Sequence, residues 1–586
     1  MKVLFFSPHA ATWIHAFPEA LVADALMKQG HDVIYITCGR TFNRFCVPMT
    51  ASGVAFDSTD EARARICERC ERNARLLQDE LQLQGQTLSD ILTPSDYEET
   101  NAILAGMSPK DITTLARDGI ELGRVALYQL VLRNKRNDLD LSEREWREYL
   151  VELKHTIYAW LAVRRLLDIH RPDRIVVYNG LYSVNRAATL LAEARGIPSY
   201  FLHAGSNLSN RLQSLMIARS DTFVYLSKII ADWRRFADVP CSHHLLSQVT
   251  DHFIETTRAR SVFAYSKERS HGLFDVRSHF GIGQDQKIII AAMSSNDEEA
   301  AGLLVGAQPP RRPPVFPTQI EWIRAVLDFI AARPELFLII RVHPREFPNR
   351  REGVTSQHAQ QLQQSLLSLP PNARVNWPAD NISLYDLVDQ ADLFLNAWSS
   401  VGKDVALLGM PVVLYGDDLT GYPAELNRVG TTLEDYFSEI DGALAEGWNF
   451  DYARRAYRWN VYEFVRCTVF IGDSYPELEH ISRSVPRKVI DRIQSRLDPD
   501  FRQHRDLKRR LPHMQAEKQI DEILTTKACC LPELMDPEQV EQASFDEETA
   551  ALRVELKRLA DALFPAPEFR KLSRLYGRLV GEVVPS

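Results

Sequence analysis

The chain has 586 residues, of which 45% are hydrophobic and 25% charged, and its formal net charge is -9. A chain of this length exceeds one hydrophobic core, so we expect about three or four domain-sized units of ordinary globular composition. The acidic balance argues against a general nucleic-acid binder, and no segment approaches the roughly 20 apolar residues of a membrane span. Because residues 1–10 resemble a first strand and not a signal peptide, a cytoplasmic location is expected.

The first half of the chain alternates predicted strands and helices. Hydrophobic residues recur at helical spacing from Phe17 onward, and Gly30 is a natural helix terminator. The predicted elements are, in order, strand 2–8, helix 17–29, strand 31–38, a mainly helical insertion over about 60–168, strand 173–180, helix 184–196 and strand 197–205, followed by the segment SDTFVYLS at 220–227. This alternation predicts a parallel sheet.

A second α/β series follows an irregular segment at 240–285. Its predicted elements are, in order, strand 287–293, helix 318–332, strand 335–342, helix 359–369, strand 373–377, helix 383–390, strand 392–397, helix 400–409 and strand 411–416. The loop 307–317 is rich in proline and long for a strand–helix connection, which is typical of a mobile or binding loop. After about residue 425 the chain is predicted to be helical to its end.

Two consecutive series of this kind predict an α/β fold with two Rossmann-like, doubly wound domains facing a cleft. We expect an N-terminal domain over 1–265 that carries the helical insertion, a second domain over 266–425 and a helical region over 426–586. The carboxyl ends of parallel strands meet at one edge of each sheet, and ligands bind there. Polar residues at the strand ends are therefore the candidates for function.

The strand 335–342 ends in a basic, hydrogen-bonding sequence. Arg341 and His343 supply hydrogen-bond donors, Pro344 stiffens the turn, and Arg345 adds a further cation. Such a group is either an ordinary surface strand end or one side of a site for an anion.

A later strand end opens a helix with two hydroxyl groups. Ser399 and Ser400 combine with Gly402, which permits close approach of a ligand, at a helix start that attracts anions. Asp404, one turn further on, could accept a hydrogen bond from a ribose hydroxyl or simply favour the helix dipole. Alone this is an ordinary helix cap, but with His343 at another strand end of the same sheet it predicts a phosphate site.

The loop after strand 287–293 is polar as well. Ser294, Ser295 and Asn296 could meet a diphosphate through their hydroxyl and backbone N–H groups. The acidic residues that follow them indicate an alternative, in which this loop is the solvated start of a helix.

The strings RVHPRE, NISLYDLVDQAD and SSVGKDVALLGMPVV occur in this order within about 285–425. They resemble the donor half of bacterial surface-polysaccharide glycosyltransferases of the GT-B fold, especially the capsule and lipopolysaccharide biosynthesis proteins and the Kdo-transferase-like group. The resemblance implies that His343, Pro344, Ser399 and Ser400 bind the nucleotide and phosphate of a nucleotide-sugar donor. The His-Pro pair with paired serines indicates a CMP-linked donor.

The resemblance also implies that the N-terminal half holds the acceptor and the catalytic base. The loop after the first strand supplies three candidate catalytic residues, His9, His15 and Glu19, because an acceptor hydroxyl needs a base if the reaction inverts the anomeric centre. The candidates for acceptor binding are Trp13, which could stack on a sugar ring, Asn179 and His203. Each of these residues could instead serve in ordinary turn formation or packing.

Four of the eight cysteines, Cys38, Cys46, Cys67 and Cys70, lie close together in the sequence. The last two have the spacing of half a zinc site, and the first two could complete a tetrahedral structural zinc. The alternative is four separate reduced thiols, as a cytosolic location favours. No catalytic metal is expected, because GT-B transferases usually need none for the donor.

The segment 483–510 is rich in Lys and Arg. It could contact anionic lipid or a lipid-linked acceptor at the inner face of a membrane, although its interleaved acidic residues favour a solvated helix face. We predict a metal-independent glycosyltransferase that moves a sugar from a nucleotide-activated donor to a bacterial surface glycan. The alternatives are a nucleotide-sugar epimerase of the GT-B fold and a non-catalytic glycan-assembly protein.

Overall fold

The computed structural model describes residues 1–259, 265–270, 272–308, 315–349, 353–417, 421–475, 498, 500–540 and 543–581. The centre of the Pro-rich loop 307–317 and most of the basic segment 483–510 lie outside the described residues, so the predictions made for them remain predictions. No helix within the described ranges has both the length and the apolar character of a bilayer-spanning segment.

The N-terminal domain is built on a seven-stranded sheet with the order β13-β6-β5-β4-β1-β2-β3. Its strands are β1 (Lys2–Phe6), β2 (Asp32–Thr37), β3 (Gly85–Thr87), β4 (Arg174–Tyr178), β5 (Ser199–Ala204), β6 (Ser214–Arg219) and β13 (Val469–Phe470). The first five are parallel in the order 3-2-1-4-5 of a doubly wound fold, whereas β6 runs antiparallel to both of its neighbours, β5 and β13. The Rossmann-like prediction is therefore confirmed for this half.

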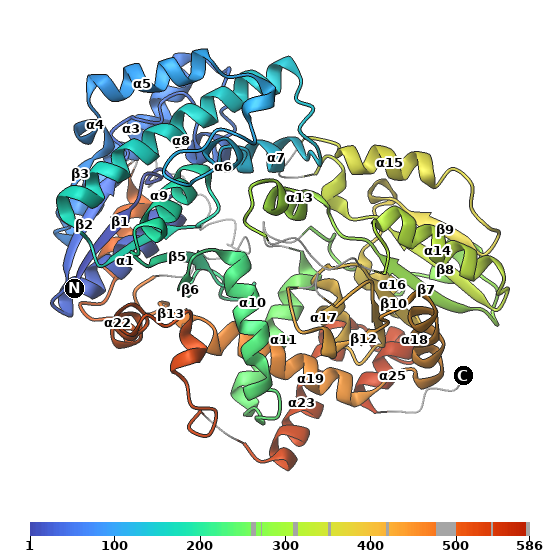
Figure 1. Ribbon diagram of the computed structural model, residues 1–586. Helices are drawn as coiled ribbons and strands as arrows, with labels where there is room; N and C mark the ends of the chain where they lie inside the picture. The colour runs from blue at the N-terminus through green and yellow to red at the C-terminus, as the bar shows by residue number, and fades with distance from the viewer. Residues whose placement is uncertain are drawn as a thin grey trace.

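Helices surround this sheet, and the predicted helical insertion lies mainly over one end of it (Figure 1). The helices are α1 (Trp13–Lys28), α2 (Val47–Ala51), α3 (Asp60–Leu81), α4 (Leu88–Ile91), α5 (Pro94–Ala105), α6 (Leu122–Val125), α7 (Tyr128–Asn134), α8 (Glu143–His170), α9 (Ser183–Ala194), α10 (Thr222–Asp232) and α11 (His243–Arg258). The segment 220–227 contributes to α10 and not to a strand, and the strand that precedes it, β6, was not predicted.

The second domain has a fully parallel sheet with the order β9-β8-β7-β10-β11-β12. Its strands are β7 (Lys287–Ala292), β8 (Leu336–Arg341), β9 (Ala373–Asn376), β10 (Leu393–Asn396), β11 (Val412–Leu414) and β12 (Arg428–Val429). Counted along the chain this is the Rossmann order 3-2-1-4-5-6. All six residues of β8 are buried, as expected for a strand covered on both faces by helices.

The helices that accompany this sheet follow the predicted alternation. They are α12 (Val276–Phe280), α13 (Asp297–Leu304), α14 (Gln319–Ala331), α15 (Gln357–Ser365), α16 (Leu384–Leu387), α17 (Val401–Ala406) and α18 (Leu433–Glu446). The last of these packs into the core of this domain, where the indole of Trp322 donates a hydrogen bond to the hydroxyl of Tyr436 at 2.8 Å.

The chain after residue 425 serves both domains instead of forming a unit of its own (Figure 1). Its described elements after α18 are α19 (Phe450–Val461), the π-helical turn η6 (Tyr462–Arg466), β13, α21 (Phe501–Arg509), α22 (Glu517–Thr526), α23 (Phe545–Leu563), α24 (Pro567–Arg570) and α25 (Arg574–Val580). β12 extends the second sheet and β13 the first, and α22 packs on α1. α25 returns to the second domain, where Arg574 pairs with Asp392 at 2.9 Å.

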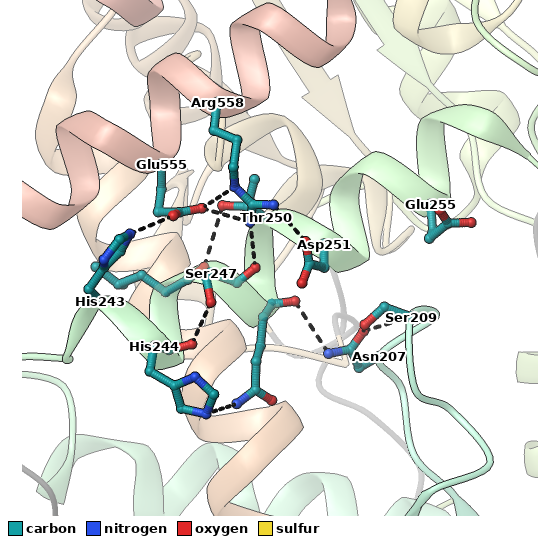
Figure 2. A network of polar contacts seen from close by, with 12 residues as sticks. Asn207, Ser209, His243, His244, Ser247, Thr250, Asp251, Glu255, Glu555 and Arg558 are labelled. Atoms are coloured by element: carbon teal, nitrogen blue, oxygen red, sulfur yellow. Dashed lines mark hydrogen bonds and ion pairs between the residues drawn. The ribbon is translucent and has the colours of Figure 1, made fainter. Parts of the chain in front are cut away.

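A polar network fastens the returning helix α23 to the linker helix α11, as Figure 2 shows. His243 lies 2.8 Å from Glu555, and Arg558 pairs with Asp251 at 2.7 Å while donating to the carbonyl of Ser247 at 2.8 Å. These contacts join the C-terminal end of the chain to the segment between the two domains.

A buried ion pair completes this attachment. Glu548 of α23 accepts hydrogen bonds from the guanidinium of Arg458 at 2.9 and 2.6 Å and from the backbone N–H of Cys241 at 2.9 Å. The side chain of Glu548 is only 1% exposed, so its charge depends on these donors.

Glu548→Gln is expected to destabilise the protein by about 3 kcal/mol, because the buried Arg458 loses its close counter-charge and keeps the exposed Asp238 at 4.0 Å. Thermal unfolding measures the effect as a fall in Tm. Lys557→Gln, which removes an exposed charge from the same helix, is the control and should leave Tm nearly unchanged. Equal Tm values for both variants would contradict the role given to the pair.

Candidate functional site

The ends of three neighbouring strands are aligned in the second domain. Ala292 of β7 pairs with Arg341 of β8 on one side and with Asn396 of β10 on the other. The chain order reverses between β7 and β10, and this reversal is the place where ligands bind in open α/β sheets. The residues two positions beyond these three ends are Ser294, His343 and Trp398. The predicted anion-binding residues therefore share one sheet edge, as expected.

The loop 294–296 is held mainly by contacts within the protein. The hydroxyl of Ser294 is buried and accepts a hydrogen bond from the N–H of Trp398 at 3.0 Å, which ties the ends of β7 and β10 together. The N–H of Asn296 donates to Glu346 at 2.9 Å. Of the two serines in this loop, the half-buried Ser295 is the one whose hydroxyl has no hydrogen-bond partner among the described residues.

His343 is half-buried at the turn where Pro344 begins a short 3-10 helix. Its Nδ1 accepts a hydrogen bond from the N–H of Arg345 at 3.2 Å, so the proton of the neutral ring lies on Nε2. Burial lowers the pKa of His343 to about 4, which keeps the ring neutral near pH 7. Nε2 has no partner among the described residues, and its N–H is therefore available to a ligand oxygen.

The two arginines beside His343 already have protein partners. Arg341 donates to the side chain of Asn376, and burial lowers the pKa of its guanidinium to about 10. Arg345 lies 2.9 Å from Asp297 and also pairs with Glu298 in the first turn of α13. The charge of Arg345 is thus balanced within the protein, whereas Arg341 donates to the neutral side chain of Asn376.

The turn at Ser399 and Ser400 differs from the prediction in two respects. The predicted helix 400–409 is only six residues long as α17, so its dipole is weaker than expected. Ser400 is exposed, and Ser399 accepts only a long hydrogen bond, 3.4 Å, from the N–H of Val401. Both hydroxyl groups can therefore still reach a ligand.

Gly402 and Asp404 do not occupy the positions expected for ligand contacts. A Cβ atom on Gly402 would lie 1.9 Å from the hydroxyl of Tyr422 and 2.6 Å from the amide nitrogen of Asn396, so side chains of the protein fill the space beside this glycine. Asp404 is buried, with the hydroxyl of Tyr385 donating to it at 3.4 Å. Burial raises the pKa of Asp404 to about 6. Both residues support the turn from within the domain.

A cluster of imidazole and phenol rings occupies the equivalent edge of the N-terminal domain. The sheet order reverses between β1 and β4, and Phe6 and Val177 align the two strand ends. Ring centroids lie 5.7 Å apart for His9 and Tyr182, 6.2 Å for Tyr182 and His15, 4.3 Å for His15 and Tyr178, and 5.9 Å for Tyr178 and His203. Three predicted histidines, two from the segment after β1 and one from β5, are thus brought together by two tyrosines.

The three histidines of this cluster are neutral near pH 7. Burial lowers the pKa of His9 and His15 to about 3 and that of His203 to about 4. Nδ1 of His203 lies 2.9 Å from the carbonyl oxygen of Ala204, which can only accept, so Nδ1 carries the proton and Nε2 the lone pair. Nδ1 of His15 is buried and has no partner among the described residues.

Glu19, Trp13 and Asn179 have roles within the fold that the sequence did not reveal. Glu19 is 2% exposed and accepts a hydrogen bond from Ser7, and burial raises its pKa to about 8, so it is protonated and unsuited to act as a base near pH 7. Trp13 stacks on Phe17 and donates to Asp506 of α21 at 2.9 Å. Asn179 has φ 65° and accepts from the N–H of Leu181, as turn residues do.

The cysteine cluster does not support the predicted structural zinc. No group of three or more His, Cys, Asp or Glu among the described residues is arranged to hold a metal ion. Metal binding requires thiolates, whereas burial raises the pKa of all four thiols: Cys38, Cys46, Cys67 and Cys70. They are free cysteines that come from three different segments and surround a cavity.

The two sheet edges meet through contacts between the domains. Arg124 of α6 donates to the carbonyl of Leu304 at 2.8 Å, and Arg186 of α9 donates to the carbonyl of Gly306 at 3.1 Å. Tyr128 of α7 is buried, and burial is the main reason why its pKa is raised. The next two causes are Glu298 of the second domain and Tyr182 of the N-terminal domain, so both lie close to this hydroxyl. The histidine cluster and the His343 edge therefore border the same interface.

Three aromatic residues at this interface were not predicted. Trp398 follows β10 directly and lies edge-on to Tyr415 with centroids 5.8 Å apart. Tyr265 lies 5.9 Å from His343 and comes, like Tyr128, from a segment without a strand pattern. Of these three residues, Trp398 is the one that the sequence could have identified as a ligand contact. It stands just before the two serines near a strand end, where an aromatic ring can stack on a ligand ring.

No family model matches the sequence, and no curated protein matches it. Among solved structures the chain is similar to a putative UDP-N-acetylglucosamine 2-epimerase from Listeria monocytogenes, with 12% identity over 85% of this chain and 97% of that chain and a TM-score of 0.27. It is also similar to UDP-GlcNAc 2-epimerase from Neisseria meningitidis (13%, 79% and 97%, TM-score 0.26) and to the spinosyn rhamnosyltransferase SpnG (12%, 79% and 95%, TM-score 0.23). The strand orders and registers described above define the fold without these neighbours.

Glu19→Gln is expected to make the protein more stable relative to wild type as the pH rises from 5 to 8. Because the folded-state pKa of Glu19 is about 8 and the ordinary value is 4.5, the carboxyl contributes its full stability below about pH 4.5 and loses it as the pH approaches 8. The limiting slope is about 1.4 kcal/mol per pH unit.

The measurement is Tm of both proteins at pH 5, 6.5 and 8. Glu98→Gln, on the exposed face of α5, is the control and should give a difference from wild type that does not vary with pH. A Glu19→Gln difference that is equally constant would show that this carboxyl ionises normally in the folded protein.

Proposed function

We propose that the protein is a glycosyltransferase that transfers a sugar from a nucleotide-activated donor to a bacterial surface glycan such as capsule or O-antigen. The observation that supports this most is that each sheet has a Rossmann-type switch point and that α6 and α9 of one domain contact the backbone at the end of α13 of the other. One edge offers neutral hydrogen-bond donors and the other a cluster of neutral histidines. Transfer between two bound substrates needs hydrogen-bond donors for the leaving nucleotide at one edge and a base for the acceptor hydroxyl at the other.

In this proposal the second domain holds the donor. The Nε2–H of His343 and the hydroxyl groups of Ser295, Ser399 and Ser400 donate to the phosphate oxygens, and the buried charge of Arg341 lies close by. Donors that are fixed in place stabilise the negative charge that develops on the departing nucleotide. The sugar then projects toward the N-terminal domain.

The N-terminal domain supplies the base in this proposal. The base must be unprotonated to accept the proton of the acceptor hydroxyl, and the lone pair of the His203 ring lies on Nε2 because Nδ1 donates to the carbonyl of Ala204. His15, stacked on Tyr178 in the same cluster, is the second candidate. Glu19 is replaced in this role because its carboxyl is buried and protonated.

The donor class is tested by measuring Tm in the presence of CMP-, CDP-, UDP-, GDP- and ADP-linked sugars. A ligand that binds only the folded state raises Tm, and we expect one nucleotide class to do so. Incubation with that donor and no acceptor then separates two activities: a transferase hydrolyses the donor slowly at most, whereas an epimerase converts its sugar.

His343→Ala is expected to lower turnover by about 100-fold or more, since the lost Nε2–H acts on the ligand, while Tm of the free protein falls only by the loss of one 3.2 Å hydrogen bond from the N–H of Arg345. His513→Ala removes an exposed histidine on the surface and serves as the matched control. Wild-type turnover in purified His343→Ala would contradict the assignment of the donor site.

A further inference from the structure

A cavity of about 270 Å³ lies at the carboxyl edge of the N-terminal sheet, on the side of β1 away from β4. Its wall includes the four thiols of Cys38, Cys46, Cys67 and Cys70 together with apolar side chains such as Phe42 and Ile66. Burial keeps these thiols protonated, so they behave as small apolar groups. Water needs two to four polar partners to occupy a cavity, and this wall offers few of them.

The cavity is large enough for a substantial apolar group. An apolar protein cavity of about 150 Å³ binds benzene, so by proportion this one has room for about ten carbon atoms. The side chains around the cavity leave this volume unfilled, although larger apolar residues at the same positions would occupy it. A small buried residue such as Ala74 lines the wall at a point where larger apolar residues would fill the space.

The cavity shares a wall with the candidate catalytic loop. Pro8 and Ala10 line it, whereas His9 between them packs edge-on against Tyr182 of the histidine cluster. The loop is fixed there by the amide of Asn73, which donates to the carbonyl of Ala10 at 2.9 Å. The loop segment 8–10 therefore lies between a group bound in the cavity and the histidine cluster.

The mouth of the cavity is polar and charged. Arg40 forms a two-pronged pair with Glu71, with both N–O distances at 2.8 Å, and the exposed Arg75 stands beside them. An apolar chain can enter the thiol-lined interior while a polar head group remains at this rim. An apolar interior with a charged rim is typical of a binding site for an amphipathic molecule.

We propose that the cavity binds the aliphatic chain of an amphipathic acceptor and holds its polar head at the rim formed by Arg40, Glu71 and Arg75. The assignment to an acceptor rests on the proposed function, whereas the binding of an aliphatic chain does not. The ligand class is a glycoside or glycolipid with an alkyl or acyl chain of about eight to ten carbons within the cavity.

The test uses n-octyl β-glucoside and methyl β-glucoside on the unaltered protein without any nucleotide sugar. The cavity thiols react slowly with a maleimide because they are buried and protonated, so labelling is continued until Cys67 and Cys70 are partly modified in the protein without glycoside. The modified peptides are then quantified by mass spectrometry. The octyl glycoside is expected to slow labelling of Cys67 and Cys70 at least threefold, and the methyl glycoside to leave it unchanged. Cys529, a half-buried thiol that does not line the cavity, is the internal control.

Ala74→Phe is expected to abolish this protection, because its ring fills the cavity. Since the labelling of wild type needs no variant, a failure of Ala74→Phe to fold leaves the test intact. Equal labelling of Cys67 and Cys70 with both glycosides, or protection of Cys529 to the same degree, would overturn the proposal. A negative donor screen with octyl protection intact would reject the glycosyltransferase and keep the cavity site.

Discussion

In-register pairing of parallel strands decides which side chains can meet in this protein. Ala292 pairs with both Arg341 and Asn396, and Phe6 pairs with Val177, so the residues that follow each strand emerge at common edges. Slipping any of these strands by one residue would move each of its side chains to the opposite face of the sheet and shift its following loop relative to the others. The two switch points, and with them both halves of the proposed site, depend on that register.

The return of the chain to the N-terminal sheet gives the two edges a fixed relation. β13 and α22 join the first domain, α25 joins the second, and the buried pair of Arg458 with Glu548 holds the path between them. The contacts of Arg124 and Arg186 with the backbone after α13 close the other side of the interface. A site divided between two domains needs this kind of support, since neither edge alone could orient two substrates.

Much of the fold followed from the sequence because hydrophobic runs and turn residues act locally, and the strand–helix alternation predicted both sheets and their functional edges. The individual side chains were harder, because their roles depend on partners distant in the sequence. Trp13 donates a hydrogen bond to Asp506, and Ser7 donates one to Glu19. The hydroxyl of Tyr422 occupies the space beside Gly402. The cysteine spacing suggested a metal, but burial favours thiols around a cavity.

The most direct measurement is photolabelling of the protein with an azido derivative of the nucleotide that raises Tm, followed by mapping of the labelled peptides. The proposed donor site predicts label in the peptides that follow β7, β8 and β10, which contain Ser295, His343 and Ser399, with excess unmodified nucleotide suppressing it. Label confined to the N-terminal domain, or spread without regard to these three loops, would contradict the site.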